Sequence, residues 1–333
     1  MKACMKALVV AGLCVSMALG MVGCGSKPLD GSQVVATVGE KEVTLGEANF
    51  LLRYQQVQTE YYYESLLGTG IYEMDLYGTG STYGDEFKAD VMGQIQEYYV
   101  VEQKAADYGV ALTDEEKAKI TEVATAFLEA NDANAKEQMT ADQATVERVL
   151  TLMTLRSKVA ATVKAEADVT ITDEEAIQRG FSYISISKGS EDTALTEEEV
   201  AAYKEKLTAV AASVKEGNSM EGAAVEQGMT AYNGNYGEGT SQYYAEELLA
   251  ALDGVKEGEV TEIIETETDL HIGVITAEID EEATANMKET LLASAQTEYY
   301  NGLLETWMAE YEVTVNDSVW EQVVFDRSYD PAA

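Results

Sequence analysis

Alternation of apolar and polar residues predicts a β-strand at 181–186, near the middle of the chain. Phe181 and Tyr183 fall on one face of this strand, and Ile184 and Ile186 fall on the other. The residues that follow, up to Ile279, switch between helical and extended patterns. The predicted elements, in order, are a helix from the capping sequence at 196–199 to Gly217, a glycine-rich turn at 233–237, a helix at 245–252, and strands at 260–264 and 270–275.

Apolar residues at three- and four-residue spacing predict that the rest of the chain is mostly helical. A strand, a tight turn and a short strand come first, at 34–44, and Thr44 with Glu47 then forms a capping box. Thr113 and Thr172 each precede the acidic sequence Asp-Glu-Glu, which is typical of a helix N-terminus. Further helices are predicted at 87–108, 144–163 and 283–311, and an extended segment at 313–315.

Tyrosine and glycine recur through residues 61–84, which we interpret as a long loop or an irregular lid. Tyrosine offers a large amphipathic surface at a low cost in conformational entropy, so the segment could present a surface for unfolded chains. The alternative is that the rings fill gaps between helices. The tyrosines concerned are Tyr61, Tyr62, Tyr63, Tyr72, Tyr77 and Tyr83.

Composition limits the class of protein and its partners. A chain of 333 residues, 46% of them apolar, is long enough for two or three compact units. It carries 60 Asp and Glu against 22 Lys and Arg, a formal charge of -38. This charge argues against electrostatic binding to nucleic acid or to an anionic lipid surface, and favours neutral or basic partners.

The first 23 residues have the character of a signal peptide. Lys2 and Lys6 precede an uncharged apolar run that is short for a membrane span. The sequence Met21-Val-Gly-Cys24 resembles a bacterial lipobox, whose cysteine carries lipid in the mature protein. Cleavage there would remove Cys4 and Cys14 and leave Cys24 as the single thiol. An ordinary signal peptide cleaved nearby is the alternative.

The order of elements between 181 and 279 resembles the parvulin type of peptidyl-prolyl isomerase domain. Three short sequences carry the resemblance: Gly217-Asn-Ser-Met220 at the end of the first helix, Asn233-Gly-Asn-Tyr-Gly237, and Leu270-His271-Ile272. The pattern Val-Ala-Thr-Val-Gly at 35–39, followed by Val43-Thr44 and Glu47, resembles the start of extracytoplasmic foldases of the PrsA and SurA type.

This resemblance implies an α+β fold: a mostly helical N- and C-terminal chaperone domain with an inserted, small parvulin-like domain, whose antiparallel or mixed sheet is flanked by helices. The implied divisions are a lipoprotein signal peptide at 1–23, a lipidated cysteine and tether at 24–33, the N-terminal helical domain at 34–178, the parvulin-like domain at 179–279, a C-terminal helix returning to the helical domain at 280–325, and a tail at 326–333.

The resemblance also implies a site. Parvulins usually hold two histidines on neighbouring central strands, hydrogen-bonded to each other and to a Cys or Asp, above a floor of Met, Gln and Phe that receives proline. The second histidine matches His271, while Tyr183 occupies the first position and could hydrogen-bond His271 across the strands. The implied catalytic residues are His271, Tyr183 and Thr230, and the implied substrate-binding residues are Met229, Gln242, Tyr243 and Tyr244.

The expected activity is cis/trans isomerisation of X-Pro peptide bonds, which needs no cofactor and no metal. Because Tyr183 replaces a histidine, the alternative function is that of a holdase chaperone without catalysis. His271 would then be a buried core residue. A solute-binding lipoprotein would need two α/β lobes, which the helical halves argue against. The expected partners are unfolded secreted polypeptides, a second copy of the chain in a homodimer, and the outer face of the bacterial cytoplasmic membrane through lipid on Cys24.

Overall fold

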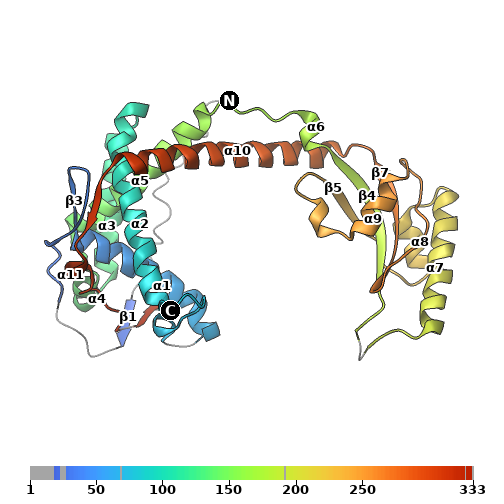
Figure 1. Ribbon diagram of the computed structural model, residues 1–333, viewed down its shortest axis with the longest axis horizontal. Coiled ribbons are helices and arrows are strands. Elements are labelled where there is room, and N and C mark those ends of the chain that lie inside the picture. The colour runs from blue at the N-terminus through green and yellow to red at the C-terminus, as the bar shows by residue number, and fades with distance from the viewer. Residues whose placement is uncertain (1–18, 23–27, 68–69, 191–192, 327, 332–333) are drawn as a thin grey trace. The chain divides into compact units, whose positions relative to one another are not determined.

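The computed structural model describes residues 19–22, 28–67, 70–190, 193–326 and 328–331 (Figure 1). Most of the predicted signal peptide, Cys24 and residues 25–27 of the tether lie outside the described residues. The chain divides into two compact units. Met1–Ala167 and Glu298–Ala333 form the helical unit, and Asp168–Thr297 form the sheet unit. The predicted fold class, a mostly helical domain interrupted by a small domain with an antiparallel sheet, is confirmed.

The helical unit combines long helices with a three-stranded antiparallel sheet of order β3-β2-β8. Because β8 lies near the C-terminus, the two ends of the chain meet in this sheet. A separate pair joins β1 (Leu19–Val22) to β9 (Ser328–Pro331). The other elements are β2 (Val34–Val38), β3 (Lys41–Thr44), α1 (Leu45–Leu67), η2 (Ile71–Glu73), α2 (Tyr83–Lys104), η3 (Ala105–Tyr108), α3 (Asp114–Ala130), α4 (Ala133–Gln138), α5 (Gln143–Glu166), β8 (Val313–Val315) and α11 (Asp317–Trp320).

Local capping fixes the starts of several helices, as predicted. In α3 the Thr113 hydroxyl accepts from the Glu116 amide, and the Glu116 carboxylate accepts from the Thr113 amide. Thr44 and Glu47 make the same reciprocal pair at the start of α1. At the end of η3, Gly109 adopts φ +64, a left-handed conformation that suits glycine and stops the helix.

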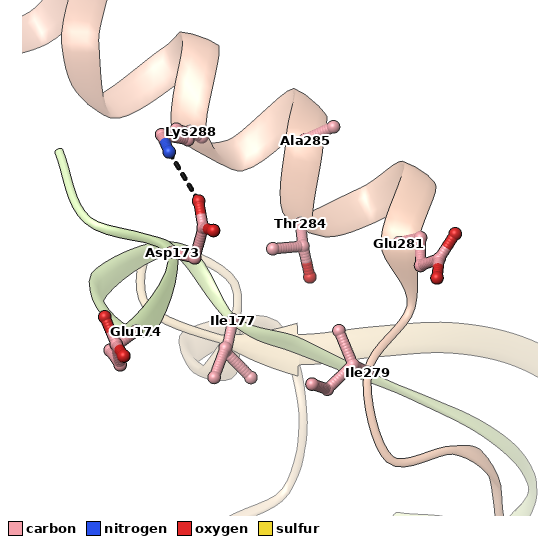
Figure 2. A pocket seen from close by; sticks show the side chains of 8 residues that line it. All are labelled: Asp173, Glu174, Ile177, Ile279, Glu281, Thr284, Ala285 and Lys288. Atoms are coloured by element: carbon pink, nitrogen blue, oxygen red, sulfur yellow. Dashed lines mark hydrogen bonds and ion pairs between the residues drawn. The ribbon is translucent and has the colours of Figure 1, made fainter.

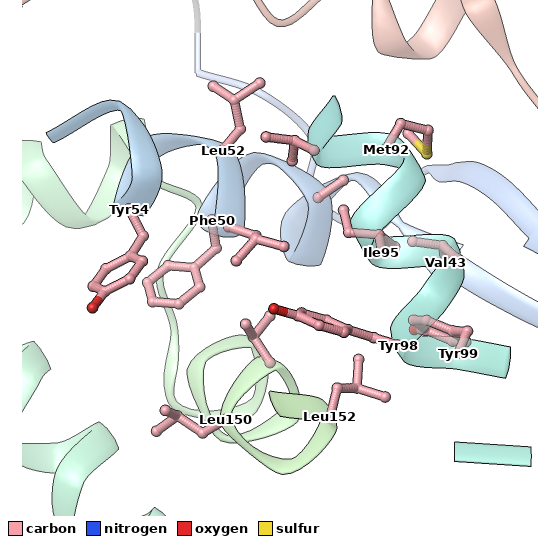
Figure 3. Close-up of a cluster of buried hydrophobic side chains, with 14 of the residues drawn as sticks. Val43, Phe50, Leu52, Tyr54, Met92, Ile95, Tyr98, Tyr99, Leu150 and Leu152 are labelled. Atoms are coloured by element: carbon pink, nitrogen blue, oxygen red, sulfur yellow. The ribbon is translucent and has the colours of Figure 1, made fainter. Parts of the chain in front are cut away.

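One large apolar cluster holds the helical unit together (Figure 3). It draws side chains from α1, α2, α3, α5 and the strands, and Phe50 of α1 meets Phe127 of α3 edge to face at 5.4 Å. Tyr300 and Trp307, from the C-terminal part of α10 (Glu281–Glu310), are also buried in this cluster. The helix that follows the sheet unit in sequence therefore completes the core that the N-terminal helices begin.

The tyrosine-rich segment is more regular than predicted. Helix α1 continues to Leu67, because no glycine or proline interrupts residues 47–67. Tyr72 is only 7% exposed and stacks on Phe325 at 4.1 Å with nearly parallel rings, so this tyrosine fills a gap in the core. Tyr77 is exposed. The side chains of residues 61–67 lie outside the described part of the structure.

The sheet unit contains a four-stranded antiparallel sheet of order β5-β4-β7-β6. Helices α7 and α8 lie on one side of the central strands and α9 lies on the other (Figure 1). Its elements are α6 (Asp173–Ala176), β4 (Gln178–Ser187), α7 (Glu197–Lys215), α8 (Met220–Glu226), β5 (Tyr232–Gly237), η4 (Ser241–Tyr243), α9 (Glu246–Asp253), β6 (Ile264–Glu265) and β7 (Asp269–Ala277).

Two predictions for this unit were wrong in detail. The glycine-rich stretch at 233–237 is the edge strand β5 and not a turn. A Cβ atom at Gly237 would lie 2.2 Å from the Ile177 carbonyl oxygen, so glycine here permits close packing. The run at 260–264 yields only the short strand β6 at its end, and Val260 makes a lone bridge to Val274.

Within the described ranges, no helix has both the length and the apolar character needed to cross a membrane.

Candidate functional site

The register of the two central strands determines which side chains share a face. Antiparallel pairing places Tyr183 of β4 opposite Gly273 of β7, and Ser185 opposite His271. Directly opposite residues project to the same side of a sheet, and alternate residues of one strand share that side. Phe181, Tyr183 and His271 therefore all lie on the face that α9 covers. The division of β4 between its two faces is as predicted.

His271 is a buried, neutral imidazole. It is only 5% exposed and lies between Ser185 of β4 and Ile264 of β6. Burial lowers its pKa below the ordinary value of about 6.5, although the nearby carboxylates of Asp269 and Glu247 act in the opposite direction. Its Nδ1 atom is buried and finds no hydrogen-bond partner among the described residues. The folded chain therefore leaves one buried polar atom of this ring without a partner.

The lowered pKa of His271 predicts a pH effect on stability. The unfolded chain binds a proton near pH 6.5 and the folded chain only at lower pH, so the unfolded state gains protons first as the pH falls. The neutral imidazole therefore makes its full contribution to stability at a pH above the pKa that His271 has in the unfolded chain. This contribution is lost as the pH falls through the lower pKa that His271 has in the folded chain. We expect the stability advantage of the wild type over His271→Gln to shrink between about pH 7.5 and about pH 5.

Urea unfolding of both proteins, at the two pH values, measures this difference and cancels the contribution of the many carboxylates. Since His271 is the single histidine of the sequence, a chain without a histidine tag also gives one imidazole signal, whose titration is followed by NMR. An advantage that is the same at both pH values, or an NMR midpoint at or above about 6.5, would contradict the prediction.

Aromatic rings form a continuous surface beside His271, which we name the aromatic face: Phe181, Tyr183, Tyr232, Tyr236 and Tyr244. The ring of Tyr183 lies 5.3 Å from that of Phe181, 5.8 Å from that of Tyr232 and 5.9 Å from that of Tyr244. Burial is the main cause that raises the pKa of the Tyr183 phenol, and the neighbouring phenols of Tyr244 and Tyr232 raise it further. Tyr232 is 53% exposed, so the aromatic face is open to solvent at this end.

Two glycines allow the covering elements to approach the aromatic face. A Cβ atom at Gly234 would lie 2.4 Å from the Tyr244 hydroxyl oxygen, so glycine lets Tyr244 lie edge-on to Phe181 at 4.9 Å. A Cβ atom at Gly273 would lie 2.9 Å from Leu252 of α9. The site is thus an aromatic surface beside one buried imidazole.

The other residues implied by the resemblance are more dispersed. Tyr243 is 75% exposed, Gln242 is exposed and donates to the Gly239 carbonyl oxygen at 2.7 Å, and Thr230 is exposed. Met229 is buried with the cluster of α7 and α8, on the opposite side of the sheet. Their roles stay predictions.

The pairing between Tyr183 and His271 also stays a prediction. The two residues are diagonal neighbours, and no hydrogen bond joins them in the described structure. Two members of the aromatic face, Tyr232 and Tyr236, were missed from the sequence. Tyr236 lies in the predicted turn and Tyr232 directly precedes it, which concealed that both residues lie on one face of a strand next to β4.

No group of three or more His, Cys, Asp or Glu residues in the described part of the chain could hold a metal ion.

Comparison with known proteins gives a family for this unit. Residues 185–277 match the family described as Rotamase, a PPIC-type PPIASE domain. No curated protein matches the chain in sequence.

Similar solved structures include the peptidylprolyl isomerase PrsA from Bacillus cereus, with 20% identity, 72% of this chain and 90% of that chain covered, and a TM-score of 0.32. The foldase protein PrsA from Streptococcus pneumoniae has 17% identity, with 76% and 98% covered and a TM-score of 0.33. A SurA-like chaperone from Campylobacter jejuni has 8% identity, with 85% and 98% covered and a TM-score of 0.30.

The matched residues run from the end of β4 to the end of β7 and include His271 and most of the aromatic face. The sheet unit of this chain is therefore a parvulin-type peptidyl-prolyl isomerase domain.

Proposed function

We propose that this chain is a lipid-anchored, extracytoplasmic foldase that speeds the cis/trans isomerisation of X-Pro bonds in secreted proteins. The observation that carries the proposal is the placement of His271, a buried neutral imidazole with a free Nδ1 atom, beside the aromatic face of a parvulin-type domain. The proline ring is compact and apolar, and rings such as Tyr183 and Tyr244 offer it an apolar surface.

The chemistry requires rotation without bond cleavage. Twisting a peptide bond costs about 18–20 kcal/mol, because the resonance of the amide is lost. A twisted amide has less charge separation than a planar one, so a site with little water favours it over the planar ground state. The aromatic face would hold the proline ring, and the buried His271 imidazole beside it would supply a fixed dipole in place of water.

The proposed location rests on the N-terminal sequence. Met21-Val-Gly-Cys24 follows a basic start and an apolar run, and Cys24 would be the single thiol after cleavage. Lipid on Cys24 would hold the protein on the outer face of the cytoplasmic membrane, where exported chains emerge. Metabolic labelling with a radioactive fatty acid tests this, since label lost in Cys24→Ala supports the anchor and label retained there refutes it.

The activity is tested by NMR exchange or a protease-coupled assay on a panel of X-Pro peptides, with residues 25–333. This chain keeps every described element except β1. We expect isomerisation to be at least about tenfold faster than the uncatalysed reaction, which takes tens to hundreds of seconds at 25 °C. Rates equal to those without protein, across the whole panel, would refute isomerisation.

A second candidate function is a holdase that binds unfolded chains without catalysis. The observation that favours it is that the Tyr183 hydroxyl makes no hydrogen bond to His271 among the described residues. The same preparation would then suppress the aggregation of an unfolded client while leaving the isomerisation rate unchanged. Loss of both effects would refute both candidates.

A further inference from the structure

A cavity of about 440 Å³ lies on the sheet unit where its chain enters and leaves, and no residue of the aromatic face lines it (Figure 2). Ile177, which directly precedes β4, and Ile279, after β7, line it together with Ala285 of α10. Ile279 is 54% exposed, so its apolar side chain is accessible to a ligand. A volume of this size accommodates one or two side chains of a bound peptide.

The walls of this cavity are held by hydrogen bonds between its two chain segments. The Asp280 amide donates to the Gln178 carbonyl oxygen at 2.8 Å, and the Gln178 amide donates to the Thr284 hydroxyl at 3.0 Å. The Asp280 side chain accepts from the Ala283 amide at 2.9 Å and fixes the start of α10. The cavity is therefore formed before any ligand arrives, which lowers the entropic cost of binding.

The rim of the cavity is acidic. Asp173, Glu174, Glu281 and Lys288 supply its charges. Lys288 forms an ion pair with Asp173, so its positive charge is already compensated (Figure 2). Glu174 and Glu281 are exposed and make no ion pair with any described residue. Two uncompensated carboxylates next to an apolar floor attract a cation attached to an apolar group.

From this geometry we propose a second peptide-binding site, for an extended segment in which an apolar residue is flanked by Lys or Arg. The apolar side chain lies on Ile177 and Ile279, and the cationic side chains face Glu174 and Glu281. The site does not use His271 and does not require proline. It would retain a basic, apolar segment of a client independently of isomerisation.

The test measures fluorescence anisotropy of a labelled, proline-free peptide containing Lys-Leu-Lys, titrated with residues 25–333. We expect Glu281→Lys to weaken binding by about tenfold, since it reverses a charge at the rim. Glu282→Lys is the matched control, because Glu282 is the next residue of the same first helical turn and does not line the cavity. It should change the affinity by less than about twofold.

The apolar contact is tested separately. Ile279→Ser should weaken binding by about fivefold or more, because it removes exposed apolar area from the floor. Val225→Ser is its control, since Val225 is also exposed but lies on α8. The proposal would be overturned if Glu281→Lys and Glu282→Lys lost affinity equally, or if Ile279→Ser and Val225→Ser did. It would also be overturned if a Lys-Ser-Lys peptide bound as tightly as the Lys-Leu-Lys peptide. So would self-association of the chain that Ile279→Ser abolishes, since a second copy would then occupy the cavity.

The outcome is independent of the proposed function. A His271→Ala chain that binds the Lys-Leu-Lys peptide with unchanged affinity supports the second site even if no isomerisation is ever detected. Loss of that binding in His271→Ala, with the sheet unit still folded, would place the peptide on the aromatic face and overturn the proposal.

Discussion

Replacement of His271 by alanine is expected to lower kcat/KM for X-Pro isomerisation by about 100-fold or more, equivalent to about 2.7 kcal/mol of transition-state stabilisation. The reason is local. His271 is the single imidazole of the chain, and its unused Nδ1 atom lies within the buried part of the site. Alanine leaves a void between Ser185 and Ile264, which supplies neither the fixed dipole of the imidazole nor a dry environment.

Loss of activity through unfolding has to be separated from loss of chemistry. His271→Gln keeps most of the side-chain volume and a hydrogen-bonding group, and its kcat/KM should still fall by at least about tenfold. Val225→Ser, on α8 at the opposite side of the sheet, should keep an activity within about twofold of the wild type. Circular dichroism checks that each variant is folded. Full activity in folded His271→Gln would show that the imidazole is not needed.

Gly237→Ala is expected to destabilise the sheet unit by about 3 kcal/mol. The added Cβ atom would lie 2.2 Å from the Ile177 carbonyl oxygen and 2.7 Å from the Gln178 side-chain nitrogen. The first of these is a backbone atom, so β5 must move away from β4 to relieve the contact. Gln178 also accepts a hydrogen bond from the Thr240 hydroxyl at 2.6 Å, and this bond would be strained.

Gly254→Ala is the matched control in the same unit, since its added Cβ atom would lie 3.4 Å from its nearest neighbour, the Ala251 carbonyl oxygen. This variant should change stability by less than about 0.5 kcal/mol. Both tryptophans, Trp307 and Trp320, belong to the helical unit. Tryptophan fluorescence should therefore report an unchanged urea-unfolding transition of the helical unit in Gly237→Ala. Circular dichroism of the tyrosines in urea should report the lower stability of the sheet unit. Equal stabilities for the two glycine variants would contradict the argument.

Elements that depend on local sequence were predictable. The threonine caps at Thr113, Thr172 and Thr196 were read directly from the sequence, and all three form capping boxes in the structure. Periodicity located the long helices and the two central strands. These features depend on residues three or four positions apart, so no information about tertiary contacts was needed.

Features that depend on a partner in space were not predictable in the same way. Gly234 and Gly237 looked like turn residues, because only the neighbouring strand and Tyr244 reveal why a side chain is excluded there. The placement of Met229 follows from α8, a short helix that the sequence pattern did not predict. The register that sets Ser185 opposite His271 is likewise a property of two strands that lie far apart in sequence.

The pairing of β2 with β8 has a consequence for the order in which the chain can fold. Val38 pairs with Val313, so the sheet of the helical unit is incomplete until almost the whole chain has been synthesised. The sheet unit is a single continuous stretch, 168–297, and all its strands are available earlier. Contacts between distant residues form slowly, because a long loop must close first. During synthesis from the N-terminus, the isomerase domain can therefore reach its native structure while the helices that precede it still await their last strand.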